Sequence, residues 1–427
     1  MTRRRPLALV LSVFLLLAVT TSCGNVLNAG VEASSRPREL QPDVDQSEIR
    51  NVVEGNNAFA LDLYEVLRAE HGNLVCSPYS ISVALAMTYA GARGETEAEM
   101  SRAMYFEPVG AQLHPALNAL DLAITARAAD TADGQPLQLS IANATWAQQG
   151  YDFLPEYLDL LAANYGAGLR LADFQGNPEP ARLDINRWVR RQTQNRIEDL
   201  LGKGSIGTDT RMVLVNAIYF KADWLQPFEK EDTFPAPFYL LDRSEVQVEM
   251  MSGSVDAPYA SGPGYQLIEL PYAGGTTAMD IFVPDRDHFE DLESALTSDG
   301  IQASLAELQP AAIELSLPKF RFSTDVSLAQ NLRTLGASRA FDPTQADFSG
   351  MTGNRDLYIS DAIHKAFVAV DEAGTEAAAA TGVIMGVTSA PMPGTTLTID
   401  RPFIFVIRDL QTGQILFLGR VLNPTQS

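Results

Sequence analysis

The stretch "HKAFVAVDEAGTEAAAATGVIMGVTSAPMPG", residues 364–394, decides the fold, because a strand-like run passes into a long segment without a large core anchor. Gly374 permits a backbone reversal. In an extended chain, one face from that point on is small or apolar and uncharged; it comprises Thr375, Ala377, Ala379, Thr381, Val383, Met385 and Val387. A short capped helix from Thr375 is the alternative, but Gly382 and Gly386 follow it and so short a helix is unstable alone.

Composition indicates one large, acidic domain. The chain has 427 residues, 46% of them hydrophobic, and a formal charge of -22. That charge argues against a nucleic-acid or anionic-membrane footprint and against activation by an anionic polysaccharide. Length alone suggests two or three domains, but residues 51–427 contain no second linker, repeat or low-complexity segment, so we expect a single domain there.

The N-terminus is typical of an export signal. Three arginines and the apolar run Leu7–Val19 predict a signal peptide over residues 1–22. Small residues before Cys23 are similar to a bacterial lipoprotein box, although Thr20 departs from it, and ordinary cleavage nearby is the alternative. We expect an exported, extracellular or cell-envelope lipoprotein with a lipid on Cys23. The polar residues 23–50 predict a flexible tether, and Cys76 is expected to be a small buried hydrophobe.

Hydrophobic periodicity predicts an α+β fold. Apolar residues recur at helical spacing over residues 57–70 and 80–91, and again over 181–201. Strand patterns dominate afterwards, from residues 211–224 to the last one at 413–424. Early helices followed by many strands indicate large, mostly antiparallel sheets.

The motifs of common enzyme classes are missing from the sequence. The four histidines lack paired metal-ligand spacing, and no G-x-S-x-G elbow or P-loop occurs. We therefore expect neither catalysis nor a metal or other cofactor. His364 lies alone in an apolar strand-like run, which is more typical of a hydrogen-bonded core group than of a catalytic base.

Six blocks in order resemble the serpin family over nearly all of residues 51–424. They are "NLVCSPYSISVALAMTYAGARGETEAEM" (73–100), "INRWVRRQTQNRIEDLL" (185–201), "LVNAIYFKADWLQPF" (214–228), "LPKF" (317–320), "HKAFVAVDEAGTEAAAAT" (364–381) and "DRPFIFVIRD" (400–409). The resemblance implies a monomer with three β-sheets, eight or nine helices and an exposed reactive-centre loop.

The resemblance also assigns residues to two structural regions. It places Ser77, Ser80, Asn216 and His364 in a polar cluster beneath the central sheet, where the strands part. It places Trp224, Lys319 and Glu372 where the loop enters the top of that sheet. A Lys319–Glu372 ion pair is our hypothesis there.

By resemblance, the protein is an irreversible suicide inhibitor of serine proteases. Cleavage of the loop, trapping of the acyl-enzyme and insertion of the loop as a strand would follow in that order. The hinge comprises Glu372, Gly374, Thr375, Ala377, Ala378, Ala379, Ala380 and Thr381. Ala373 departs from the charged residue common in the family, and we expect it to be tolerated.

Family spacing places the cleaved bond at Thr388–Ser389, within a residue or two, with Met385 as a second candidate. Small uncharged residues there favour elastase- or subtilisin-like targets, and cysteine proteases remain open. The alternative is a non-inhibitory serpin that binds or chaperones other proteins. A surface-anchored hydrolase is the third hypothesis, but it lacks a recognisable nucleophile.

Overall fold

The computed structural model describes residues 30–129, 137–375 and 395–426, and it confirms an α+β architecture. The hinge residues Ala377–Thr381, the bond Thr388–Ser389 and Cys23 lie outside these residues. The α-helices of the described part are α1 (Gln46–Leu67), α2 (Pro78–Tyr89), α3 (Gly94–Ala103), α4 (Leu113–Ala129), α5 (Pro155–Tyr165), α6 (Pro178–Gln192), α7 (Phe289–Ser294), α8 (Ser298–Ala306), α9 (Leu328–Thr334) and α10 (Ser349–Thr352).

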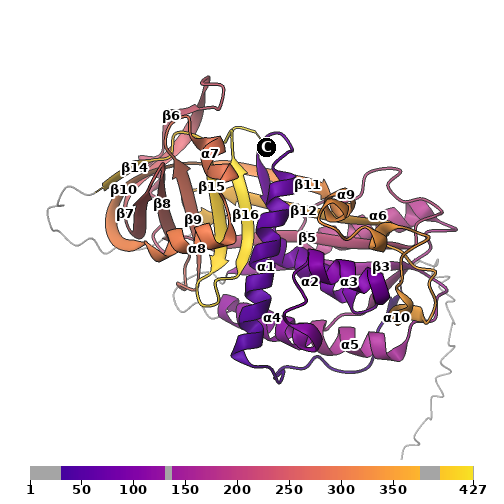
Figure 1. Cartoon of the computed structure of the whole chain (residues 1–427). Helices are drawn as coiled ribbons and strands as arrows, with labels where there is room; N and C mark the ends of the chain where they lie inside the picture. The colour runs from indigo at the N-terminus through magenta and orange to yellow at the C-terminus, as the bar shows by residue number, and fades with distance from the viewer. Residues whose placement is uncertain (1–29, 130–136, 376–394, 427) are drawn as a thin grey trace, which may run out of the picture.

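The strands form two hydrogen-bonded sheets, which lie on either side of α1 in Figure 1. The first has the order β1 (Val31–Glu32), β4 (Leu169–Ala172), β3 (Gln138–Gln148), β5 (Met212–Asp223), β13 (Gly374–Thr375), β12 (Asp361–Val370) and β11 (Phe320–Ser327). The second has the order β14 (Thr395–Thr398), β10 (Gln309–Pro318), β7 (Glu245–Gly262), β8 (Tyr265–Pro271), β9 (Thr277–Pro284), β15 (Phe403–Asp409), β16 (Ile415–Val421) and β2 (Leu74–Cys76), and β6 (Phe234–Tyr239) pairs with β7.

The number of helices is close to the expected eight or nine, since the described residues hold ten α-helices, three of which, α7, α9 and α10, are short. The number of sheets differs from the expected three. Two sheets replace three because β7 is 18 residues long. Its first part pairs with β6 and β10, and its end pairs with β8. Because one continuous strand takes part in all three pairings, the strands on both sides of it belong to a single sheet.

The central strands of the first sheet are covered on both faces. Ile218 and Ala366 face the main core on the side of α2, whereas Val215 and Ile363 face a second apolar cluster with Trp188 of α6. Strands buried on both faces need continuous apolar runs rather than alternation. A strand added between β5 and β12 would therefore bury the face that it turns towards α2.

Residues 30–45 correct the expectation of a flexible tether over 23–50. Val31 and Glu32 pair with Arg170 and Leu169 at the edge of the first sheet. Arg38 donates to Asp121 at 2.6 Å, and helix α1 already begins at Gln46. Backbone hydrogen bonds and an ion pair hold this segment, rather than apolar packing. Its sequence therefore shows no hydrophobic periodicity from which an ordered segment could be predicted.

Replacing Arg38 by alanine should lower the melting temperature by a few degrees. The side chain donates to Asn118 at 2.8 Å and to Asp121, and both bonds are partly buried. Charge-assisted hydrogen bonds of this kind contribute about 1–3 kcal/mol. Thermal unfolding followed by circular dichroism measures the change. Arg36→Ala, at an exposed position nearby, is the matched control, and equal shifts in both variants would contradict a clamping role for Arg38.

Candidate functional site: a sheet held open at one end

The first sheet is parted at one end by the two residues of β13. Strands β5 and β12 pair in parallel from Val213 and Asp361 up to Tyr219 and Phe367. Beyond that point β13 lies between them, antiparallel to both. The chain that follows Thr375 therefore starts inside a slot that the sheet already provides.

A tight turn brings the chain back into this slot. The N–H of Asp371 donates to the carbonyl of Gly374 at 2.9 Å, and its carboxylate accepts from the N–H of Ala373 at 2.9 Å. Gly374 has φ 155°, and a Cβ there would lie 2.1 Å from the carbonyl oxygen of Ala222. Only glycine fits so close a backbone approach, which is why the hinge needs Gly374.

Thr375 is fully buried, and its side chain faces the core. Its hydroxyl lies 2.7 Å from the hydroxyl of Tyr272, whose ring stacks on Trp224 with centroids 4.6 Å apart. Trp224 also donates from its indole N–H to the carbonyl of Asp371 at 3.1 Å. The sequence identified Trp224 but not Tyr272, which directly follows β8 of the second sheet.

The Lys319–Glu372 ion pair predicted from the sequence is present. The Lys319 ammonium lies 3.0 and 2.9 Å from the two carboxylate oxygens, and Thr233 donates to one of them at 2.8 Å. Burial acts to raise the pKa of Glu372, but these hydrogen bonds hold it below its usual value. The pair ties Glu372, within the turn, to Lys319, which lies between β10 and β11.

The four residues expected in a polar cluster lie together beneath the sheet. Ser77 caps α2, and its N–H donates to Nε2 of His364 at 3.2 Å. Nε2 is therefore the acceptor, so Nδ1 of His364 carries the proton and donates to Asn216. Asn216 in turn donates to the Ser80 hydroxyl at 2.6 Å.

Asn143 completes this cluster and was missed from the sequence. It lies opposite Asn216 in the β3–β5 register and accepts from both Asn216 (2.5 Å) and Ser80 (3.1 Å). A polar residue at a buried position of a predicted strand was its only signal. The cluster thus bridges β3, β5, β12 and α2 at the place where β5 and β12 still pair.

Acid should destabilise the protein through His364. Burial lowers the pKa of His364 to about 3 and that of His114 to about 4, below the usual 6.5. Below pH 6.5 the unfolded chain gains protons that the native chain excludes, so stability is retained above that pH and lost as the pH falls. One such histidine costs about 2 kcal/mol between pH 6.5 and 5.

Urea unfolding at pH 7 and pH 5 tests this dependence. The free energy of unfolding should fall less between pH 7 and pH 5 in His364→Asn than in the parent chain. Subtracting one change from the other cancels the contributions of the titrating groups that both chains share. His71→Asn at an exposed position is the control. Identical slopes in the parent and His364→Asn would show that His364 is not held neutral.

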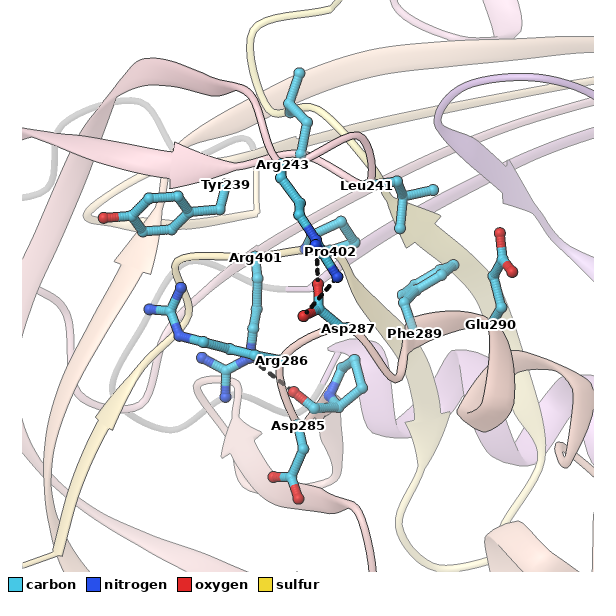
Figure 2. Close-up of a pocket in the computed structure, with 12 residues that line it drawn as sticks. Tyr239, Leu241, Arg243, Asp285, Arg286, Asp287, Phe289, Glu290, Arg401 and Pro402 are labelled. Carbon is cyan, nitrogen blue, oxygen red and sulfur yellow. Dashed lines mark hydrogen bonds and ion pairs between the residues drawn. The ribbon is translucent and has the colours of Figure 1, made fainter.

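A separate cavity of about 490 Å³ lies between the β6–β7 turn, the β9–α7 connection and the start of β15 (Figure 2). Its charges are largely paired: Arg243 lies 3.2 Å from Asp287, and Arg401 donates to the carbonyl of Pro284 at 2.7 Å. Of the hinge and cluster residues that the structure describes, none lines it. We assign it no part in the mechanism below.

Comparison with known proteins identifies the family. The model of the serpin (serine protease inhibitor) family matches residues 54–424. The mouse leukocyte elastase inhibitor A is 39% identical over 382 residues, which cover 86% of this chain and 98% of that protein. An uncharacterized serpin-like protein of Thermococcus kodakarensis is 37% identical over 394 residues, covering 92% and 90%.

A solved structure agrees with these sequence matches. Uncleaved ovalbumin superimposes with a TM-score of 0.78 at 29% identity, over 87% of this chain and 100% of that one. The family match covers most of the described residues, including the hinge turn and the polar cluster. The chain therefore belongs to the serpin family of serine protease inhibitors and is not itself an enzyme.

Proposed function

We propose that this protein is an inhibitory serpin that traps its target by loop cleavage, acyl-enzyme capture and strand insertion. The observation that carries the proposal is β13, which already occupies the upper end of the slot between β5 and β12. A sheet that accepts the first two residues of the loop needs only to continue parting along the same line.

The register of β13 supports this path. Gly374 pairs with Asp223 on one side, and Thr375 pairs with Val370 on the other. Continued in the same register, Thr381 would come opposite Asn216 and His364, which are themselves partners across β5 and β12. The inserting strand would thus replace the direct β5–β12 pairing at Asn216 and His364, which the polar cluster now bridges.

The side chains of the loop suit the face they would meet. Because Thr375 points inward, alternation in an inserted strand would turn Ala377, Ala379 and Thr381 inward as well. Their neighbours across the slot would be buried apolar residues, Phe220 and Val368 for Ala377, then Ile218 and Ala366 for Ala379. Small side chains enter such a core at little steric cost.

Specificity follows from the residues at the cleaved bond. The proposed bond, Thr388–Ser389, and its second candidate, Met385, lack the cation that trypsin-like pockets need and the aromatic side chain that chymotrypsin-like pockets prefer. We assign elastase- or subtilisin-like serine proteases as targets. The name of the mouse relative supports an elastase.

Incubation with an elastase-like and a subtilisin-like protease, followed by denaturing electrophoresis, tests the proposal. A covalent band of summed mass is expected, together with a smaller cleaved fraction. Mass spectrometry of the released peptide should place the cut at Thr388 or within two residues of it. Clean loop cleavage without the band would instead support a non-inhibitory serpin acting as a binding protein.

The cell envelope is the proposed location. The signal-like residues 1–22 and the cysteine at position 23 support export and a lipid anchor. Within the described ranges, no helix is long and apolar enough to span a membrane. Mass spectrometry of the exported protein should find Cys23 as the acylated first residue, and a first residue elsewhere would contradict the anchor.

A further inference from the structure

A short run of arginines lies at the end of helix α6 in this acidic chain. Acidic residues outnumber lysine and arginine by 53 to 31, yet residues 187–196, "RWVRRQTQNR", contain four arginines and no acid. Arg187, Arg190 and Arg191 lie on the exposed side of α6. The net charge therefore conceals a local positive face, which we call the α6 face and define by these three residues with Leu183, Arg170 and Val31.

The α6 face has few counter-ions of its own. Arg187 pairs with the half-buried Asp184, and Arg190 lies 3.9 Å from the largely exposed Glu198. Arg191 has no ion-pair partner among the described residues. Exposed pairs of this kind contribute little and exchange readily with other anions.

Arg170 adds an uncompensated charge at the edge of this face. Its guanidinium lies 4.5 Å from the ring centre of Trp188 and 5.5 Å from that of Trp146. The indole N–H groups of both tryptophans lack an acceptor within the described part of the chain. Burial and repulsion from Arg191 lower the pKa of Arg170. Arg170 therefore adds a positive charge next to Arg191 at the edge of the α6 face.

Exposed apolar side chains accompany these charges. Leu183 precedes Arg187 by one helical turn and is 45% exposed. Val31 is 55% exposed and pairs with Arg170 across β1 and β4, so both side chains lie on the same face of the sheet. Arginine mixed with exposed aliphatic groups is typical of surfaces that meet lipid headgroups.

The chain towards the proposed anchor leaves the body beside this face. Gly30 accepts from the N–H of Leu171 at 2.8 Å, next to the β1–β4 pair. Cys23 precedes Gly30 by seven residues, which span at most about 25 Å even when fully extended. An acyl chain on Cys23 would therefore hold the β1 edge, and with it the α6 face, close to the bilayer.

We propose that the α6 face docks on an anionic lipid surface. This departs from the expectation drawn from the net charge, because a bilayer touched by α6 responds mainly to charges within the Debye length of about 8 Å. A juxtamembrane arginine raises the affinity for such a surface by about fivefold. The inference is independent of the inhibitory mechanism.

Vesicle sedimentation of the mature full-length chain carrying Cys23→Ser tests the face without the lipid. The chain should bind vesicles of 30% phosphatidylglycerol in phosphatidylcholine at 50 mM salt, and pure phosphatidylcholine only weakly. The triple variant Arg187→Gln, Arg190→Gln, Arg191→Gln should bind at least tenfold more weakly. Release of the parent chain by 0.5 M salt is also expected.

A second triple variant, Arg102→Gln, Arg243→Gln, Arg355→Gln, is the matched control. These arginines are exposed on other parts of the surface, and the variant has the same net charge. Equal loss of binding in both variants, or no binding of the parent chain, overturns the proposal. Retention by soluble dextran sulfate without vesicle binding also overturns it, in favour of a polysaccharide partner.

Discussion

Thr375→Arg should convert the protein from an inhibitor into a plain substrate. Thr375 is wholly buried between β5 and β12, with its hydroxyl on Tyr272. An arginine there would place an unpaired charge in the core, which costs several kcal/mol or expels the hinge. Either result slows strand insertion. The acyl-enzyme is then hydrolysed before the protease is distorted. We expect the covalent complex to fall at least tenfold while the loop is still cut.

The control for this variant is Thr396→Arg, which makes the same chemical change at an exposed position of β14. It should leave complex formation intact. Densitometry of the covalent and cleaved bands after reaction with the same protease measures both variants. A Thr375→Arg chain that still traps protease as well as the parent would show that the buried position of Thr375 is not needed for insertion.

The sequence predicts those residues of the site that lie in a strong local pattern or in a block that resembles the serpin family. His364 and Ser77 are 287 positions apart and no periodicity connects them, but two family blocks place both in one cluster. Lys319 and Glu372 were paired on the same basis. His364 lies in a regular strand and Ser77 at a helix start, whereas Lys319 and Glu372 lie between strands, where only the family blocks point to them.

Residues placed by pairing across strands were not predicted. Asn143 joins the cluster only because the β3–β5 register sets it opposite Asn216. Tyr272, directly after β8, reaches Thr375 from a segment 103 residues earlier in the chain. Strand β1 has two residues, too few for any period, and backbone hydrogen bonds hold it. Register and backbone pairing depend on the assembled fold, so a single sequence carries little signal of them.

Cleavage near Thr388 should raise the melting temperature by about 20 °C or more. At present β5 and β12 share one parallel ladder over seven residue pairs. An inserted strand would replace it by two antiparallel ladders and bury one face of small and apolar side chains. At about 1 kcal/mol for each additional ladder bond, plus side-chain burial, the gain is about 10–20 kcal/mol. Whole domains are stable by only about 5–15 kcal/mol, so the change in melting should be large.

Calorimetry of the parent chain before and after limited proteolysis measures this rise, with the cut mapped by mass spectrometry. Thr375→Arg, cut at the same bond, is the decisive control, because its loop is open but its hinge is blocked. If the rise came from relief of loop strain alone, both nicked chains would show it. A rise confined to the parent identifies strand insertion as its source, and no rise in either would mean that the uncleaved protein holds no energy for a trap.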